Sequence, residues 1–159
     1  MINVMFVCHG NICRSPMAEF VFKDMVDKKH LSHVFYITSS GTSCEELGNP
    51  VHRGTKKKLL EHGISSEGKK SVQFKASDYA IYNYIICMDQ QNVRNLKRII
   101  GDDPDDKIKL LLMYTGRDAD IADPWYTGNF DLTYDDVVKG CEGLLQTILK
   151  ENHNFFPRA

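Results

Sequence analysis

The chain has 159 residues, a usual length for one domain, and we expect a single domain over residues 1–159. Hydrophobic residues make up 42% and charged residues 26% of the chain, which excludes an intrinsically disordered protein. The 20 basic and 21 acidic residues give a formal net charge of −1, which excludes a general binder of nucleic acid or anionic membranes. Any anion site must therefore be local.

Cysteine usage indicates a reducing compartment. The number of cysteines is odd, and we expect no secretory signal or targeting peptide, so a disulfide framework is not expected. No apolar run approaches the roughly 20 residues that a membrane span needs. We therefore expect a cytoplasmic protein with free thiols. The cysteines are Cys8, Cys13, Cys44, Cys87 and Cys141.

Four short apolar runs alternate with helical patterns along the chain. The expected strands are residues 2–7, 35–39, 84–88 and 108–112. The expected helices are residues 15–29, a segment from 50 to about 63, residues 93–100 and residues 137–149. The runs are nearly all apolar, which is typical of parallel strands covered on both faces. This order predicts an α/β fold: a four-stranded open parallel sheet with helices on both faces and a phosphate-binding loop after the first strand.

Individual residues indicate where the expected helices begin and which side chains face the core. Ser15 is expected to cap the first helix, and Pro16 suits its first turn. Leu59 and Leu60 are expected to face the core from the second helix. The tail at residues 155–157 is expected either to pack on the last helix or to be disordered.

The segment after the first strand, residues 8–16, reads Cys-His-Gly-Asn-Ile-Cys-Arg-Ser-Pro. A tight turn from a strand into a helix points several backbone N–H groups at one spot, and the helix N-terminus adds positive potential. Gly10 and Asn11 tolerate the backbone angles that such a turn needs. We expect the loop to bind a phosphate dianion through His9, Gly10, Asn11, Ile12, Cys13 and Ser15.

Two residues of this segment carry the expected chemistry. Cys8 lies at the floor of the loop, where cations and a helix N-terminus favour the nucleophilic thiolate at neutral pH. Arg14 offers a planar, permanently charged fork that can hold two phosphoryl oxygens. Backbone amides and Arg14 can then stabilise charge as Mg²⁺ does in other phosphoryl-transfer enzymes. No metal or cofactor is expected, since no histidine has a partner at zinc-like spacing.

This string resembles the C-x-G-N-x-C-R-S-P signature of low-molecular-weight protein tyrosine phosphatases, and the likeness covers nearly the whole chain. Other matching segments are Ser40-Gly41-Thr42, Gly48-Asn49-Pro50, His62-Gly63-Ile64 and Cys87-Met88-Asp89. The resemblance implies hydrolysis of phosphotyrosine and aryl phosphates through a phosphocysteine intermediate. It also implies that Ser40 and Asn11 hold the loop in a hydrogen-bond network, that Ser15 stabilises the thiolate and that Asp89 supports the site from behind.

The expected general acid lies in the segment Asp123-Pro124-Trp125-Tyr126. It resembles the late Asp-Pro-aromatic-aromatic segment of the family, whose aspartate protonates the leaving group. Trp125 and Tyr126 can wall a slot for a flat phenyl ring. The other Asp-Pro pair lies within residues 102–106, which read instead as a solvated acidic turn.

The chain departs from the family pattern at three places. Where the family carries an aromatic residue after Ser40, residues 44–47 read Cys-Glu-Glu-Leu, so Glu45 and Glu46 form an acidic rim expected to repel acidic phosphopeptides. A histidine that often supports the network is replaced around residues 68–70. Val72 stands near the place of a usual arginine.

Three other activities on this fold are alternatives to phosphotyrosine hydrolysis. Related arginine phosphatases resemble one another in carrying threonine where this chain has Ile12, and a bulky apolar residue there favours tyrosine. Arsenate reductases use two further cysteines after the third strand, where this chain has only Cys87. A phosphocysteine carrier should not release phosphate quickly, which Arg14 and Asp123 would promote. The expected partner is a phosphotyrosine-containing protein or peptide bound by a monomer.

Cys13 has two readings that the sequence leaves open. It lies five residues from Cys8, and the family resemblance implies a reversible disulfide that protects the nucleophile from over-oxidation. The alternative is a small residue that packs beneath the loop. Cys44, Cys87 and Cys141 are expected to be structural.

Overall fold

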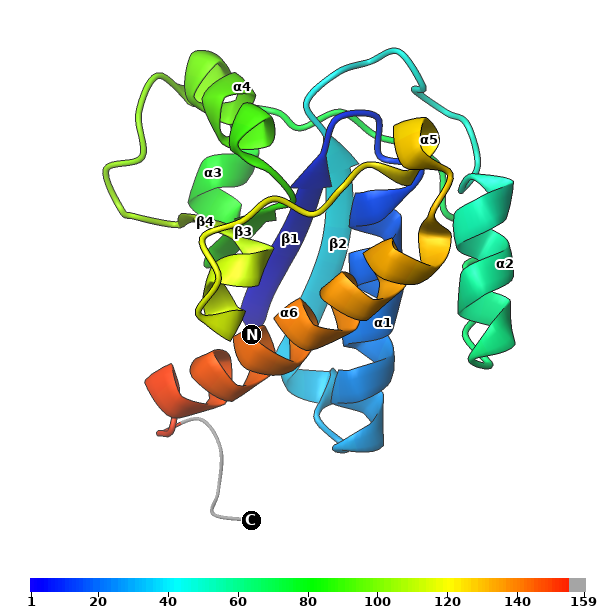
Figure 1. The fold of residues 1–159 in the computed structure, drawn as a ribbon. Coiled ribbons are helices and arrows are strands. Elements are labelled where there is room, and N and C mark those ends of the chain that lie inside the picture. Colours follow the sequence, from blue (N-terminus) through cyan, green and yellow to red (C-terminus); the bar gives the residue numbers. More distant parts are fainter. Residues whose placement is uncertain (155–159) are drawn as a thin grey trace.

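The computed structural model describes residues 1–154 and contains one four-stranded parallel sheet (Figure 1). The strands are β1 (Ile2–Cys8), β2 (Phe35–Gly41), β3 (Tyr84–Cys87) and β4 (Ile108–Leu110), in the order β2-β1-β3-β4. The predicted α/β fold is confirmed. The order reverses direction on either side of β1, so the carboxyl end of β1 lies where parallel α/β sheets bind ligands. The prediction for residues 155–157 lies outside the described residues.

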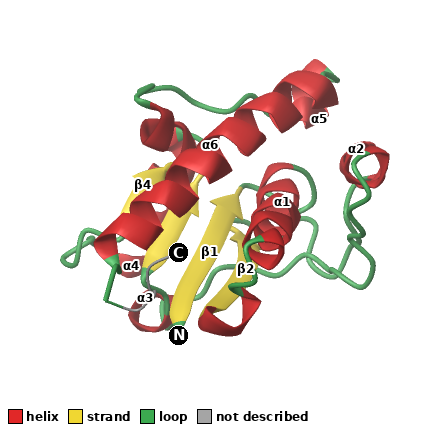
Figure 2. Ribbon diagram, turned by 90° about the horizontal axis from the view of Figure 1, so that it is seen from below, coloured by secondary structure: helices red, strands yellow, loops and turns green. Residues whose placement is uncertain are grey.

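Helices cover both faces of the sheet. The α-helices are α1 (Arg14–Lys28), α2 (Arg53–Glu61), α3 (Asp78–Ile81), α4 (Gln90–Ile100), α5 (Pro124–Thr127) and α6 (Phe130–Glu151), and the 3-10 helices are η1 (Ser32–Val34) and η2 (Leu111–Thr115). Figure 2 shows α1 and α6 on one side of the strands and α3 and α4 on the other. No helix among residues 1–154 is long and apolar enough to span a membrane.

Strand β1 packs into a hydrophobic core on each face of the sheet. Val4 and Phe6 pack into the core formed with α1 and α6, whereas Met5 and Val7 pack into the core on the opposite face. This alternation follows from the two-residue period of a strand. Burying each such side chain contributes roughly 1.5–3 kcal/mol. The residue that follows them, Cys8, is therefore held at a defined place.

The fourth strand is shorter than predicted because the chain turns onto α6. Residues 111–112 belong to η2 and not to the strand. Two glycines of α6 allow this approach: a Cβ atom at Gly140 would lie 2.5 Å from Leu111 Cγ, and one at Gly143 would collide with the Tyr114 carbonyl. The apolar run of residues 108–112 was thus divided by a contact that is not local in sequence.

Helix ends and faces differ from the expectations at several points. Cys13, and not Ser15, is the residue before α1, and it makes no side-chain capping bond. Leu60 is 55% exposed, whereas Leu59 is fully buried, because adjacent helical residues point about 100° apart. Helix α6 begins at Phe130 and not near Val137. The short helices α3 and α5 were not predicted.

Candidate active site

The loop between β1 and α1 wraps around the Cys8 sulfur. Asn11 adopts a left-handed backbone conformation with φ of 59°, and its N–H donates to Cys8 Sγ at 3.3 Å. Asparagine tolerates this conformation better than most residues. Gly41 at the end of β2 allows the loop to pass close by, since a Cβ atom there would lie 2.7 Å from the His9 carbonyl oxygen. The loop is therefore shaped by one left-handed residue and one close backbone approach.

The side chain of Asn11 fastens the loop to three neighbours. Its Nδ2 donates to Ser15 Oγ at 2.8 Å and to Ser39 Oγ at 2.9 Å, and its Oδ1 accepts from the Val72 N–H at 3.0 Å. Asn11 is 1% exposed. A buried amide with both ends hydrogen-bonded fixes the loop, because leaving either end unpaired costs roughly 1–3 kcal/mol.

The hydroxyl of Ser39, and not that of the expected Ser40, belongs to this network. Successive residues of a strand point to opposite faces, so the two serines diverge. The Ser40 hydroxyl lies 3.1 Å from Met5 Sδ, and Ser40 contributes only its carbonyl, which accepts from Ser15 Oγ at 3.3 Å. The two-residue alternation of β2 was the signal that could have separated them.

A buried ion pair behind Ser39 completes the network and was missed at the level of sequence. Ser39 Oγ donates to Glu19 Oε1 at 2.6 Å, and Lys69 Nζ donates to the Ser39 carbonyl at 2.8 Å. Lys69 Nζ also lies 3.6 Å from Glu19 Oε1. Burial lowers the pKa of Lys69 despite the attraction of Glu19. Lys69 therefore supports the loop from the region where the family histidine is absent.

Two hydrogen-bonding groups contact the Cys8 sulfur. Cys8 is 3% exposed, and its Sγ lies 3.0 Å from Ser15 Oγ in addition to the Asn11 N–H. The Ser15 hydroxyl is directed at the sulfur and the Ser40 carbonyl, and Ser15 lies inside α1 and not at its capping position. Hydrogen-bond donors and the N-terminus of α1 both favour a negative charge on sulfur. Ser15 lies where its hydroxyl can stabilise a Cys8 thiolate, and that role stays a prediction.

Arg14 is the central cation of the site. It is 3% exposed, and its Nη1 donates to Asp89 Oδ2 at 2.7 Å and to the Ile121 carbonyl at 2.9 Å. Its Nη2 lies 3.5 Å from Asp123 Oδ2. Burial alone would lower the pKa of Arg14, but Cys8, Asp89 and Asp123 together raise it. Arg14 is therefore charged and held facing Cys8.

Asp123 enters the site from the loop before α5. Its Oδ1 accepts from the Trp125 N–H at 3.0 Å and so caps α5, while its Oδ2 faces Arg14.

Asp103, of the other Asp-Pro pair, lies outside this pocket, but it is not simply a solvated residue as expected. It accepts from Tyr79 OH at 2.5 Å and from two backbone N–H groups of residues 107–108, and so fixes its own turn.

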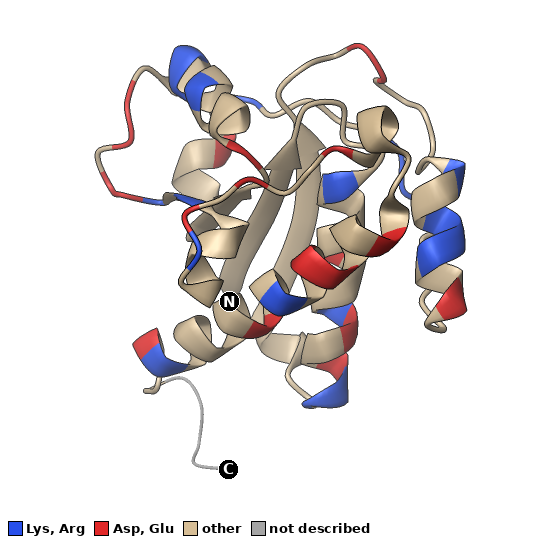
Figure 3. Cartoon of the chain, in the orientation of Figure 1, with Lys and Arg blue, Asp and Glu red and all other residues tan. Residues whose placement is uncertain are grey.

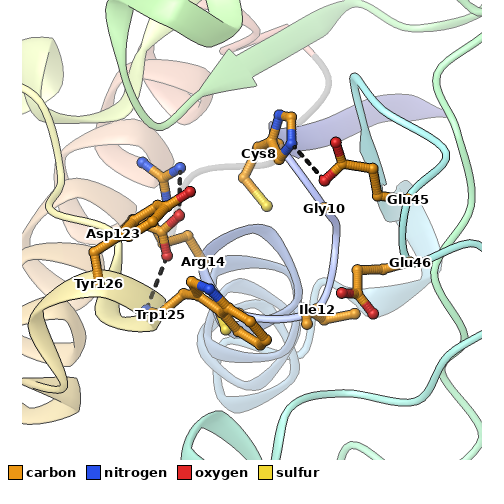
Figure 4. Close-up of a pocket in the computed structure, with 11 residues that line it drawn as sticks. Cys8, Gly10, Ile12, Arg14, Glu45, Glu46, Asp123, Trp125 and Tyr126 are labelled. Atoms are coloured by element: carbon orange, nitrogen blue, oxygen red, sulfur yellow. Dashed lines mark hydrogen bonds and ion pairs between the residues drawn. The ribbon is translucent and has the colours of Figure 1, made fainter.

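The pocket above Cys8 brings together most of the predicted site residues (Figure 4). It is lined by Cys8, His9, Gly10, Ile12, Cys13, Arg14, Glu45, Glu46, Asp123, Trp125 and Tyr126. Trp125 is 56% and Tyr126 82% exposed, so both remain available to a ligand. Figure 4 shows Glu45 and Glu46 on the side opposite Asp123 and Tyr126. His9 Nε2 lies 3.2 Å from Glu45 Oε2, which ties the acidic rim to the loop.

All five cysteines are free, and Cys13 is buried. Cys13 is 5% exposed, and its carbonyl accepts from Thr55 Oγ1 at 3.2 Å. Burial, followed by repulsion from Cys8 and Asp123, raises the pKa of Cys13 to about 12. Cys44 is exposed, contrary to the expectation of a structural role, whereas Cys87 and Cys141 are buried.

Comparison with known proteins identifies the family. A model of the family described as low molecular weight phosphotyrosine protein phosphatase matches residues 3–154. The chain is 43% identical over 153 residues to the low molecular weight protein-tyrosine-phosphatase YfkJ of Bacillus subtilis, a match that covers 95% of this chain and 98% of that protein. The crystal structure of YfkJ matches with a TM-score of 0.92 over 95% of this chain and 96% of that one.

The crystal structure of SP-PTP, a low molecular weight protein tyrosine phosphatase from Streptococcus pyogenes, is also similar. It is 42% identical and matches with a TM-score of 0.86 over 99% of this chain and all of that one. Both the sequence match and the structural match extend over almost the whole of this chain. The chain belongs to the low molecular weight phosphotyrosine protein phosphatase family.

Proposed function

We propose that this phosphatase hydrolyses phosphotyrosine in proteins or peptides, and aryl phosphates, through a phosphocysteine at Cys8. The observation that carries the proposal is the position of Arg14, buried and held between Asp89 and Asp123 beside the Cys8 loop. A fixed guanidinium next to a nucleophilic sulfur favours a trigonal, negatively charged phosphoryl group in transfer.

The reaction has two steps. The Cys8 thiolate attacks phosphorus, the bond between phosphorus and the tyrosine oxygen breaks, and Asp123 gives its proton to that oxygen. A water molecule then attacks the phosphocysteine and gives a proton to the Asp123 carboxylate. The sulfur–phosphorus bond breaks, phosphate leaves, and Cys8 is again a thiolate. Positioned acid–base catalysis of this kind contributes about 10²- to 10⁴-fold.

The pocket walls favour an aromatic phosphate. Ile12, Trp125 and Tyr126 line the pocket together with the polar loop, and they can enclose a flat phenyl ring. The phosphate would lie against the backbone of residues 9–13, within reach of the Ser15 network. Glu45 and Glu46 make the opposite rim acidic, so acidic residues on that side of a phosphopeptide should be disfavoured.

The family and the cysteines also indicate the class of substrate and the compartment. Phosphoproteins are the substrate class that the family implies. Five unpaired thiols favour a reducing compartment such as the cytoplasm. We expect the protein to act as a monomer, without a metal or cofactor, which size-exclusion chromatography with light scattering and an assay in EDTA can check.

The first experiment is hydrolysis of para-nitrophenyl phosphate near pH 6 with EDTA and reductant, comparing wild type with Cys8→Ser. Turnover that resists EDTA, is inhibited by vanadate and disappears in the variant supports the cysteine mechanism. Absence of turnover in the reduced wild type would contradict it and favour a carrier. Phosphotyrosine and phosphoarginine peptides are then compared, and faster hydrolysis of phosphoarginine would contradict the proposed substrate.

A further inference from the structure

A second groove continues from the wall of the active-site pocket. Ile12, Glu46 and Trp125 line both, so the two spaces are contiguous. The groove runs between the segment that leads into α2 and the loop at residues 66–69. Its other lining residues are Asn49, Pro50, Val51, His52, Arg53, Lys56, Ser66, Glu67, Gly68 and Lys69. A chain that leaves the phosphotyrosine pocket over Ile12 and Trp125 would enter this groove.

His52 fixes the groove relative to the phosphate-binding loop. Its N–H donates to the Ile12 carbonyl at 2.8 Å, and its ring stacks on Phe130 with centroids 5.4 Å apart. The same ring meets the Trp125 ring edge-on at 5.6 Å. Gly54 permits this packing, since a Cβ atom there would collide with the Phe130 ring. The groove therefore begins on a rigid wall that is shared with the active site.

One basic side chain of the groove forms no ion pair within the described part of the chain. Arg53, the first residue of α2, is exposed and makes no side-chain hydrogen bond or ion pair with another described residue. The other cations of the groove are engaged: Lys56 pairs with Glu67 at 2.6 Å, and Lys69 binds the Ser39 carbonyl. Figure 3 shows basic residues following one another along α2 and acidic residues in the loop between β2 and α2. Acidic side chains therefore gather in the loop between β2 and α2, and basic side chains gather along α2.

An unpaired hydroxyl also lies in the groove wall. Ser66 is 4% exposed, and its Oγ has no hydrogen-bond partner among the described residues. Buried polar groups are nearly always paired, so an unpaired hydroxyl at the wall of a groove points to a polar ligand. A peptide backbone offers carbonyl and amide groups of the kind that this hydroxyl lacks.

We propose that this groove binds the peptide segment on one side of the phosphotyrosine, and that Arg53 selects an acidic side chain there. The proposal rests on the phosphotyrosine activity proposed above and adds a specificity-determining residue to it. Glu45 lines the pocket and Glu46 lies where the pocket meets the groove, so both disfavour acidic residues next to the phosphotyrosine, whereas Arg53 lines only the groove and attracts an acidic residue there. Substrate choice would then depend on how far from the phosphotyrosine, along the groove, the acidic residue lies.

The test is an aspartate scan of phosphotyrosine peptides. A single aspartate replaces alanine at each of the three positions on either side of the phosphotyrosine, and kcat/KM is measured for each peptide. In wild type we expect one position to favour aspartate over alanine by about 2- to 5-fold, the range of an exposed ion pair. The ratio should fall to about one in Arg53→Gln. In Arg53→Glu the same position should favour lysine. Arg98→Gln on α4, a matched loss of charge elsewhere, should keep the wild-type ratio.

Three results would overturn the proposal. Equal kcat/KM for all peptides of the scan, in an enzyme that hydrolyses them well, would contradict peptide selection by the groove. It would leave the proposed phosphotyrosine activity intact. An aspartate preference that persists in Arg53→Glu would assign the selectivity to another residue. Failure to hydrolyse any of the peptides, with turnover of para-nitrophenyl phosphate retained, would contradict the peptide activity and the groove together.

Discussion

Arg14 Nη1 lies 2.7 Å from Asp89 Oδ2, and the other carboxylate oxygen of Asp89 accepts from the Asn92 N–H at 2.8 Å. One carboxylate therefore orients the guanidinium that faces the nucleophile and also caps helix α4. The Asn92 side chain accepts from the Asp89 N–H at 3.1 Å and completes a capping box. The orientation of Arg14 is thus coupled to the start of α4, on the opposite face of the sheet from α1.

Asp89→Asn separates the two roles of this carboxylate. Asparagine is as good a helix cap as aspartate, so α4 should be retained, but Arg14 loses its charged partner. A small displacement of a catalytic group can cost up to about 100-fold, and we expect kcat/KM for para-nitrophenyl phosphate to fall about 10- to 100-fold. Asp89→Ala should lose about 1 kcal/mol more in free energy of unfolding, measured in urea, because the cap is also lost. Unchanged kinetics in Asp89→Asn would mean that Asp89 does not orient Arg14.

Ser39→Ala and Ser40→Ala form a matched pair on adjacent positions of β2. Loss of the Ser39 hydroxyl removes one buried hydrogen bond from Asn11 and one from Glu19, which should cost about 1–3 kcal/mol in the free energy of unfolding. The phosphate-binding loop should loosen as well, and kcat/KM should fall. Ser40→Ala removes only a contact with Met5 sulfur and should change both quantities little. Equal effects of the two variants in urea unfolding and kinetics would contradict the assignment of Ser39.

Cys13 should resist alkylation at neutral pH. Its pKa is raised to about 12 by burial and by repulsion from Cys8 and Asp123, so it is a neutral thiol well below that pH. Its thiolate fraction, and with it the alkylation rate, should rise about tenfold per pH unit below 12 while the protein stays folded. Iodoacetamide at pH 7.5 followed by peptide mass spectrometry should label Cys8 and the exposed Cys44 before Cys13. Labelling of Cys13 as fast as Cys44 would contradict the buried, neutral thiol.

The redox role of Cys13 stays a prediction with its own readout. Slower recovery of Cys13→Ser than of wild type after peroxide and reductant would support a protective Cys8–Cys13 disulfide. Identical recovery would leave packing beneath the loop as the role of Cys13.

Asp123→Asn should affect substrates according to their leaving groups. A poor leaving group such as the tyrosine oxygen needs a proton, so kcat should fall about 10²- to 10⁴-fold for a phosphotyrosine peptide. Nitrophenolate leaves readily without a proton, so the loss with para-nitrophenyl phosphate should be smaller. Asparagine can still accept the Trp125 N–H and keep α5 in place. Equal losses with both substrates would argue that Asp123 acts by positioning and not as the acid.

The parts of the fold and site that were predictable are those fixed by local pattern. The apolar run of β1, the Gly-Asn turn and the Pro near the start of α1 place Cys8 and Arg14 at a sheet edge by sequence alone. Asp89 and Asp123 follow strands or loops that reach the same edge, so their convergence also followed from topology. These residues carry both local geometry and chemistry.

The parts that were not predictable depend on contacts between distant segments. Glu19 and Lys69 are 50 positions apart, and nothing in either local sequence indicates that they meet behind Ser39. The end of β4 depends on glycines of α6 that accept η2 at close range.

The central claim is that the phosphoryl group passes through the Cys8 sulfur. It is tested most directly by rapid alkaline denaturing quench of Asp123→Asn during turnover of phosphorus-labelled para-nitrophenyl phosphate, whose leaving group needs no proton, followed by mapping of the labelled site. Because the variant also lacks the carboxylate that activates water, the intermediate should persist long enough to be isolated. The account predicts label on Cys8, and none in the Asp123→Asn, Cys8→Ser double variant. Label on His9, or turnover in Cys8→Ser, would contradict it.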